Sequence, residues 1–388
     1  MGGELGRFSA TTRDLPGLTT GVAANGVSIV SRRESRLVRI GSVPVGGGSP
    51  ISVQSMTKTR TDDVAATVAQ IKQLEAVGCE IVRCAVPDED AASALREIKK
   101  QISLPLVADV HFQHKLALMA LENGADALRI NPGNIGGRDR VEEVARAALE
   151  RGAPIRVGVN SGSLEKKLRE RAEQTETDKR AGAVAKAMVE SARRHIGILE
   201  DLGFNDIIIS LKSSDVRTTV QSYRLMAEVC DYPFHIGVTE AGSVLSGAVK
   251  SAVGLGILLN DGLGDTVRVS LTGPPEDEVR VAYMILRALG LRERGPEVIS
   301  CPTCGRCQID LVSLVEEVER GVAGVDDAVK IAVMGCVVNG PGEAREADVG
   351  IAGGKGSGVL FRSGEIVRKV EEGELAQTLI REVRRMTE

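Results

Sequence analysis

The strongest constraint on the fold of this chain is a regular alternation of short apolar runs with longer segments of helical period, which begins at Ile51. The apolar runs have the length and composition of strands, and they cover residues 51–56, 80–86, 104–110, 127–130, 154–160, 206–212, 233–239 and 266–271. Helix-like segments, several of which end in glycine, include residues 62–78, 89–101, 139–152, 186–203 and 278–290. Alternating strands and helices indicate a parallel sheet, and eight such units favour a closed (β/α)8 barrel of the TIM type. No GxGxxG motif follows the first run, so an open dinucleotide-binding sheet lacks its fingerprint.

The same pattern predicts three parts of the chain. Residues 1–35 are predicted to be a flexible extension without a secretory signal, and residues 36–292 to be the barrel. Residues 36–50 read as a hairpin with a Gly-rich turn that could plug the N-terminal end of the barrel. The pattern changes after Gly290, and residues 293–388 are predicted to be a small α+β domain stapled by a metal centre, with a hairpin within residues 349–370.

The composition excludes several classes of function. A net charge of −4 gives no field that recruits nucleic acid, and an aromatic content of 2% without tryptophan removes the stacking platforms of single-strand binders. No apolar run approaches the length that spans a bilayer, which argues against membrane insertion. Seven cysteines without an export signal are expected to be thiols or metal ligands, which predicts a reducing, cytoplasmic compartment.

Polar side chains gather where the predicted strands end, and this is the edge of such a barrel that carries active sites. They are Arg83, Asp109, His111, Arg129, Asn131, Arg156, Asn160, Lys212, Glu240, Arg268 and Ser270. Five of them are cations, namely Arg83, Arg129, Arg156, Lys212 and Arg268. A ring of five cations repels itself unless an anion lies among them, and arginine forks suit phosphate oxygens. The pattern therefore predicts a phosphate or diphosphate ligand.

Each arginine taken alone could instead pair with a carboxylate such as Asp109 or Glu240. This explanation suffices for one cation but not for five together. Asp109 and His111 are two residues apart and would share a face of an extended strand, although His111 could equally be a satisfied core or loop histidine.

A cysteine-rich motif, CPTCGRC, opens the second domain with Cys301, Cys304 and Cys307, and Cys336 follows in GCVVNGPGE. Clustered reduced thiols indicate a metal site, and the lack of a second CxxC pair favours an iron-sulfur cluster over a zinc ribbon. Glu343 follows Cys336 across a turn-forming stretch, and its carboxylate could return to the metal as a weak oxygen ligand. Alternatively, Glu343 is a solvated loop residue.

These residues together resemble one known family. The resemblance rests on CPTCGR and GCVVNGPGE, and on VQSMT, EIVR, AD.HF, RINPGN, IR.GVNSGS and DTVRVSLT in the predicted barrel. The chain is similar over residues 36 to 375 to the bacterial 4-hydroxy-3-methylbut-2-en-1-yl diphosphate synthases of the non-mevalonate isoprenoid pathway.

The resemblance implies a [4Fe-4S] cluster bound by Cys301, Cys304, Cys336 and Glu343 in a ferredoxin- or sulfite-reductase-like domain, with Cys307 as a possible competitor for the fourth position. It implies reductive ring opening and dehydration of 2-C-methyl-D-erythritol 2,4-cyclodiphosphate. The residues then expected to bind the substrate are Arg83, Asp109, His111, Arg129, Arg156, Asn160, Lys212, Thr239, Arg268, Ser270 and Asn339. Glu240 is the candidate acid or base for the departing hydroxyl.

The resemblance also implies a head-to-tail homodimer in which one subunit's cluster closes the barrel of the other, and ferredoxin or flavodoxin as the electron donor. Two other functions stay open on the residues alone. One is a zinc-dependent phosphosugar aldolase or isomerase on the same barrel, and the other is a non-enzymatic electron carrier. A carrier has no need of a cationic barrel mouth, and a zinc enzyme would be colourless.

Overall fold

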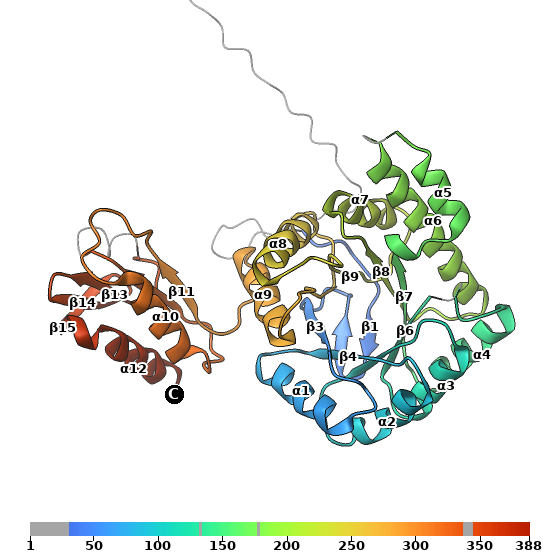
Figure 1. Cartoon of the computed structure of the whole chain (residues 1–388), viewed down its shortest axis with the longest axis horizontal. Helices are drawn as coiled ribbons and strands as arrows, with labels where there is room; N and C mark the ends of the chain where they lie inside the picture. The colour runs from blue at the N-terminus through green and yellow to red at the C-terminus, as the bar shows by residue number, and fades with distance from the viewer. Residues whose placement is uncertain (1–30, 132–133, 177–178, 337–343) are drawn as a thin grey trace, which may run out of the picture. The chain divides into compact units, whose positions relative to one another are not determined.

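The structure is a computed structural model that describes residues 31–131, 134–176, 179–336 and 344–388. It separates the chain into two compact units, one ending at Arg292 and the other beginning at Glu293 (Figure 1). Each unit has its own hydrophobic core. In the described ranges, no helix is both long enough and apolar enough to cross a membrane.

The first unit is a barrel of eight parallel strands, which confirms the predicted fold class (Figure 1). The strands are β3 (Ser52–Met56), β4 (Ile81–Ala85), β5 (Leu106–Asp109), β6 (Ala127–Ile130), β7 (Ile155–Asn160), β8 (Ile207–Lys212), β9 (His235–Ile236) and β10 (Thr266–Val267). Neighbours pair in the order β8-β7-β6-β5-β4-β3-β10-β9. A parallel bridge between Ile209 and Phe234 joins β8 to β9 and brings the ends of the sheet together.

Helices surround this barrel and cover the outer faces of its strands, whose apolar residues form one continuous core with them. They are α1 (Val64–Ala76), α2 (Glu89–Lys99), α3 (His114–Glu122), α4 (Arg138–Glu150), α5 (Lys166–Glu173), α6 (Arg180–Asp201), α7 (Val216–Ala227), α8 (Val244–Asn260) and α9 (Pro275–Ala288), with a short 3-10 turn, η1 (Ser161–Ser163), after β7. The side chains of Asp63, Asp88 and Asp215 accept backbone N–H groups in the first turns of α1, α2 and α7. These caps satisfy donors that a helix start leaves unpaired.

The N-terminal hairpin covers the N-terminal end of the barrel strands, as the sequence predicted. Its strands are β1 (Val38–Ile40) and β2 (Val43–Val45), and their apolar side chains pack against Ile81, Val107 and Ile208 near the strand starts. The turn lies at Gly41, with φ of 54°, and the glycine run follows β2 instead of forming the turn. The opposite end of the barrel, where the strands end, is lined by polar side chains.

The last two barrel strands are shorter than predicted. The apolar runs at 233–239 and 266–271 each contain a strand of only two residues. Beyond them the backbone continues with a hydrogen bond from the Arg268 N–H to the Ile236 carbonyl, and then bends. A Cβ at Gly237 would lie 2.4 Å from the Arg268 carbonyl oxygen, so these two chains approach too closely for a side chain there.

The second unit is a five-stranded mixed sheet with helices packed on it. Its elements are β11 (Glu297–Ser300), α10 (Leu311–Val322), β12 (Lys330–Met334), β13 (Val349–Gly354), β14 (Ser357–Arg362), β15 (Glu365–Glu371), η2 (Glu372–Glu374) and α12 (Leu375–Thr387). β11, β12 and β13 are parallel, while β13, β14 and β15 form an antiparallel meander. The predicted hairpin is therefore part of a three-stranded meander, and the α+β character of the domain is confirmed.

Candidate functional site

A pocket of about 170 Å³ lies at the C-terminal ends of the barrel strands. It is lined by Arg83, Asp109, His111, Arg129, Asn160, Ser210, Lys212, Thr239, Arg268 and Ser270. The structure thus brings together the predicted substrate-binding residues of the described barrel, with the exception of Arg156. The side chains converge because inward-facing residues alternate along each strand and the strand ends meet at one mouth.

Asp109 is the centre of the first charge cluster in this pocket. Its carboxylate is 5% exposed and lies 3.3 Å from Arg129 Nη1, 3.6 Å from Arg83 Nε and 3.5 Å from His111 Nε2. Burial alone would raise the pKa of Asp109, but the charges of Arg83 and Arg129 and the hydrogen bond from His111 outweigh it and lower the pKa. Asp109 is therefore an anion that holds two arginines in place.

Glu278 forms the second cluster, and it reaches the barrel from α9. Its carboxylate is 1% exposed and accepts hydrogen bonds from Ser55 Oγ at 3.0 Å and from the Leu271 N–H at 3.1 Å. Lys58 Nζ lies 3.2 Å from it and Arg268 Nη2 3.4 Å. Burial and the charge of Arg83 lower the pKa of Arg268 to about 10, although Glu278 acts in the opposite direction. Glu278 thus fixes one cation of the mouth to the helix behind it.

Lys212 and Arg156 have no such carboxylate partner in the described parts of the chain. Lys212 is 7% exposed, and its pKa is lowered well below the usual value by burial and then by Arg268, Arg156 and other cations. Arg156 is 3% exposed, does not line the pocket, and donates through Nη1 to the Gln54 side chain. Its Nε and Nη2 find no acceptor among the described residues, and burial lowers its pKa.

This balance of charge makes the mouth a binding site for anions. Of the five cations, three contact the two buried carboxylates and two, Lys212 and Arg156, have no carboxylate partner among the described residues, so the mouth has unpaired positive charge. An uncompensated buried charge is costly, and a ligand with several anionic oxygens would remove that cost. The arrangement therefore favours a phosphorylated ligand over a neutral one.

Glu240, the predicted acid or base, follows pocket residue Thr239 in the loop after β9. It has a φ of 52°, in the left-handed region that residues other than glycine seldom adopt. Its side chain is exposed, and it is not one of the residues that line the pocket. The Thr239 N–H donates to the Ser213 carbonyl at 3.3 Å, which ties this loop to the end of β8. A strained residue beside a pocket is a common feature of functional sites.

The cysteine motifs of the second unit meet at one edge of its sheet. Cys301 follows β11 and Cys336 comes two residues after β12, and these strands are parallel neighbours with Ser300 opposite Val333. The Gly335 N–H donates to Cys301 Sγ at 3.3 Å. A Cβ on Gly335 would lie 2.6 Å from Cys307 Sγ, so Cys307 packs against the same backbone. Parallel pairing therefore explains how two distant motifs come together.

Among the described residues, no group of three or more His, Cys, Asp or Glu side chains is arranged so that it could hold a metal ion. The donor set nevertheless suits a soft-thiolate cluster. Cys301, Cys304 and Cys336 lie at the surface or half-buried, and a backbone hydrogen bond with Arg306 lowers the pKa of Cys304. Two other predicted site residues, Glu343 and Asn339, lie outside the described residues.

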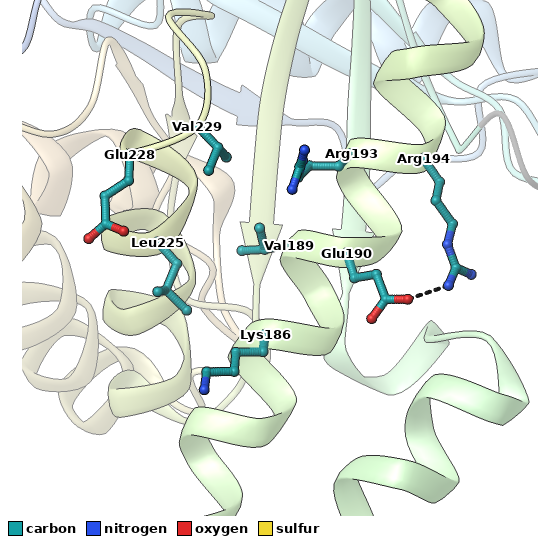
Figure 2. A pocket seen from close by; sticks show the side chains of 8 residues that line it. All are labelled: Lys186, Val189, Glu190, Arg193, Arg194, Leu225, Glu228 and Val229. Carbon is teal, nitrogen blue, oxygen red and sulfur yellow. Dashed lines mark hydrogen bonds and ion pairs between the residues drawn. The ribbon is translucent and has the colours of Figure 1, made fainter.

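A larger hollow, of about 570 Å³, lies away from the mouth between α6 and α7 (Figure 2). Its charged residues include Lys186, Arg193 and Glu228, while Glu190 is paired with both Arg171 and Arg194. Mixed signs and an existing ion pair leave this hollow without the unbalanced charge of the barrel mouth. We therefore assign the functional site to the mouth.

Comparison with known protein families decides the identity of this fold. The family model described as "GcpE TIM-barrel domain" matches residues 35–283, and the one described as "GcpE protein C-terminal domain" matches residues 297–385. The chain belongs to the GcpE family. Curated members of similar sequence are named "4-hydroxy-3-methylbut-2-en-1-yl diphosphate synthase (flavodoxin)". The family and the enzyme class that the sequence motifs predicted are confirmed.

Among these GcpE relatives, the protein of Geobacter sulfurreducens is 61% identical over 92% of this chain and 98% of its own length. The protein of Nitratidesulfovibrio vulgaris is 60% identical over 89% of this chain and 87% of its own length, and that of Clostridium acetobutylicum 55% identical over 92% and 100%. Among solved structures, a dihydropteroate synthase from Stenotrophomonas maltophilia covers 66% of this chain and 98% of its own at 15% identity and a TM-score of 0.48, a level that supports no inference.

Sequence reasoning missed three residues of this GcpE site. Ser210 lines the pocket two residues before Lys212, so the period of two along β8 could have identified it. Gln54 is a polar residue inside an apolar strand and could have been noticed for the same reason. Glu278 gave no signal, because an acidic residue in the first turn of a helix is ordinarily solvated.

Proposed function

We propose that this chain reduces and opens 2-C-methyl-D-erythritol 2,4-cyclodiphosphate and eliminates water, giving (E)-4-hydroxy-3-methylbut-2-en-1-yl diphosphate for isoprenoid precursor synthesis. The observation that carries the proposal is the excess of buried cations at the barrel mouth, in a chain of the GcpE family. A cyclic diphosphate presents two linked anionic groups to such a mouth. A neutral phosphate-free sugar would leave Lys212 and Arg156 without counter-charge.

The substrate diphosphate lies, in this proposal, among Arg83, Arg129, Lys212 and Arg268. Asp109 keeps Arg83 and Arg129 oriented, and Glu278 does the same for Arg268. Arg156 contributes its charge from below the pocket, since its guanidinium faces Gln54. The carbon skeleton and its hydroxyls are offered polar groups by His111, Asn160, Thr239 and Ser270. Side chains that are already held in place can bind the substrate in one orientation, which brings its reacting atoms into position.

The cluster ligands are proposed to be Cys301, Cys304 and Cys336, with Glu343 as a replaceable oxygen ligand. The bound [4Fe-4S] cluster would supply the two electrons of the reaction. The N–H group of Gly335 on Cys301 Sγ supports the assignment, because such hydrogen bonds stabilise a thiolate. Cys307 is assigned no ligand role, since its thiol donates to the Ile309 carbonyl at 3.3 Å.

Glu240 is proposed to exchange the proton with the departing hydroxyl, with Thr239 and Asn339 positioning the reacting carbon skeleton. The exposed carboxylate beside Thr239 supports this role, since it can reach a ligand in the mouth without a buried-charge cost in the free enzyme. Transfer of the carboxyl proton to the departing hydroxyl would let that hydroxyl leave as water.

We propose flavodoxin, which the relatives' names specify, as the electron donor, and ferredoxin as the alternative. We also propose a head-to-tail homodimer and a cytoplasmic location. The location is supported by seven free cysteines, a state that a reducing compartment maintains.

The test is turnover of the cyclodiphosphate by anaerobically purified protein with a chemical reductant. Lys212→Met is expected to lower kcat/KM at least about 100-fold, as loss of a buried charged contact does, whereas Lys72→Met, on the exposed side of α1, leaves it unchanged. Glu240→Gln is expected to lower kcat with little change in KM. Colourless protein that contains zinc and turns over a phosphosugar would instead support the aldolase reading. Full activity of Lys212→Met would overturn the assignment of the mouth.

A further inference from the structure

A buried polar cluster joins the start of α5 to α6, and we call its three residues, Glu165, Ser191 and His195, the α5–α6 cluster. Ser191 Oγ donates to Glu165 Oε1 at 3.0 Å, and His195 Nε2 lies 3.7 Å from the same oxygen. Ser191 is 1% exposed and His195 4%. The second carboxylate oxygen, Glu165 Oε2, is also buried. The carboxyl group of Glu165 is therefore directed into the protein, although none of the three residues lines the pocket at the mouth.

Neither helix capping nor the packing of α5 explains the placement of Glu165. It immediately precedes α5, where a Ser, Thr, Asp or Asn side chain commonly accepts a backbone N–H, but it makes no such bond. Leu164 and Leu168 already bury the apolar side of this segment in the core, and Arg171 pairs with Glu190 of α6. What the cluster adds is a fixed point at the residue where α5 begins.

This fixed point is close to the mouth along the chain. Glu165 follows Asn160 by five residues, and Asn160 both ends β7 and lines the pocket. Strand pairing with β8 stops at Asn160, so the chain beyond it depends on other contacts. The residues between form a tight 3-10 turn, in which Ser163 Oγ donates to the Asn160 carbonyl at 3.2 Å. So short a connection has little slack, and the position of Glu165 therefore sets the path of the chain at Asn160.

The same turn is hydrogen-bonded to two neighbouring loops of the mouth. Ser161 Oγ donates to Ser213 Oγ at 3.0 Å, directly after β8. The Ser213 carbonyl in turn accepts the Thr239 N–H from the loop after β9. Thr239 lines the pocket and precedes Glu240, with its φ of 52°. A shift of the turn after β7 would therefore reach two further strand ends.

We propose that Glu165 is a positioning residue of the mouth. Held by Ser191 and His195, it fixes the turn after β7 so that Asn160 meets the carbon skeleton of the substrate in the productive orientation. This role rests on the proposed function, in which Asn160 is assigned to that skeleton. A displacement of about 1 Å at such a group can lower a rate about 100-fold. Because the cations of the mouth bind the diphosphate, loss of Glu165 acts on kcat more than on KM.

The test measures turnover of the cyclodiphosphate by full-length, cluster-loaded protein with a chemical reductant. Glu165→Ala is expected to lower kcat about 10- to 100-fold and to change KM less than about threefold. Glu165→Gln keeps an acceptor oxygen for Ser191 and should retain kcat within about threefold of wild type. Glu173→Ala, at the last residue of α5, is the matched control, because its carboxylate is exposed. It should leave both constants unchanged.

A double variant distinguishes positioning of Asn160 from a general structural role. Asn160→Ala removes the side chain through which Glu165 acts. The loss of kcat in the double variant Asn160→Ala, Glu165→Ala should therefore fall short of the product of the two single losses by at least about fivefold. Losses that multiply in full would overturn the proposal, because Glu165 would then act independently of Asn160.

Backbone hydrogen exchange at residues 160–165, without substrate, separates this inference from the proposed function. Exchange there should be faster in Glu165→Ala than in wild type or Glu173→Ala. Unchanged kcat or unchanged exchange in Glu165→Ala refutes the positioning role while the proposed function stands. Wild-type protein that does not turn over the cyclodiphosphate refutes the proposed function and, with it, the role assigned to Asn160 and Glu165, whatever the exchange rates.

Discussion

Replacement of Lys212 by methionine separates what the barrel mouth costs in stability from what it contributes to binding. Lys212 is 7% exposed, and no carboxylate pairs with it in the described part of the chain. Its neighbours Arg268 and Arg156 carry the same charge. Methionine has a similar length and keeps the packing of the stem, so the substitution removes mainly the charge.

We expect Lys212→Met to stabilise the ligand-free protein. An unpaired buried ion has an effective penalty of several kcal/mol, and partial contact with pocket water reduces it, so the free energy of unfolding should rise by about 1–3 kcal/mol. In the presence of inorganic pyrophosphate, the wild-type protein should instead be more stable than Lys212→Met. At about 100 times its Kd, pyrophosphate stabilises the wild-type protein by about 2.7 kcal/mol, and the variant should gain much less.

The chain itself provides a probe for this measurement. It has no tryptophan, and its three tyrosines, Tyr223, Tyr232 and Tyr283, all lie in the barrel unit. The tyrosine band of the near-ultraviolet circular dichroism of cluster-free protein in urea therefore reports barrel unfolding. Lys72→Met, at an exposed position of α1, is the control and should change the free energy of unfolding little. A Lys212→Met variant that is less stable than wild type without pyrophosphate would refute the reasoning, because Lys212 would then have a stabilising partner.

The pH dependence follows from the direction of the pKa shift. The pKa of Lys212 is lower in the folded state than in the unfolded chain, so between these two values the unfolded chain binds more protons. The stability of the wild-type barrel should therefore increase with pH through this window, which ends near the ordinary lysine pKa of about 10.4. In Lys212→Met this contribution to the slope should be absent.

Three further changes test the other groups of the site. Glu278→Gln leaves Arg268 and Lys58 without their counter-charge and should lower the free energy of unfolding by about 2–4 kcal/mol, with the more exposed Glu276→Gln as a near-neutral control in urea titrations. Asp109→Asn should cost about 3 kcal/mol at neutral pH. Because the folded pKa of Asp109 is lowered, the wild type should lose this advantage as pH falls below about 4, so the two acid unfolding curves should converge. Cys307→Ser should keep the iron content and visible absorbance of the wild type, whereas Cys301→Ser should lose both.

The barrel could be predicted from sequence because its signal is local and repeated. Strands buried on both faces read as apolar runs, and the helices between them end in glycines such as Gly78 and Gly152. The length of β9 and β10 could not be predicted in this way. A Cβ at Gly237 would lie 2.4 Å from the carbonyl oxygen of Arg268. This close approach of two backbone segments depends on how the barrel closes.

The cations of the site were predictable for a related reason, since charge inside an apolar strand is conspicuous at residues such as Arg129 and Arg268. The partners of these cations were not. Glu278 is ten residues from Arg268 in the sequence but belongs to a helix whose rotation sets whether the carboxylate faces solvent or the barrel. Arg156 looks equivalent to Arg129 in sequence, and only the structure places its guanidinium on Gln54 below the pocket.

The lumen of the barrel is a poor source of stability, and this explains how the mouth can hold unpaired charge. Below the pocket, polar atoms of Ser52, Gln54, His235 and Thr266 have no hydrogen-bond partner among the described residues. Burial and the nearby cations lower the pKa of His235, so it is neutral and adds no further charge. The apolar layers lie elsewhere, between strands and helices on the outside and under the N-terminal hairpin at the base. Because these layers are separate from the lumen, substitutions in the outer shell should alter stability without altering affinity for anions, whereas substitutions of the charged residues at the mouth should alter both.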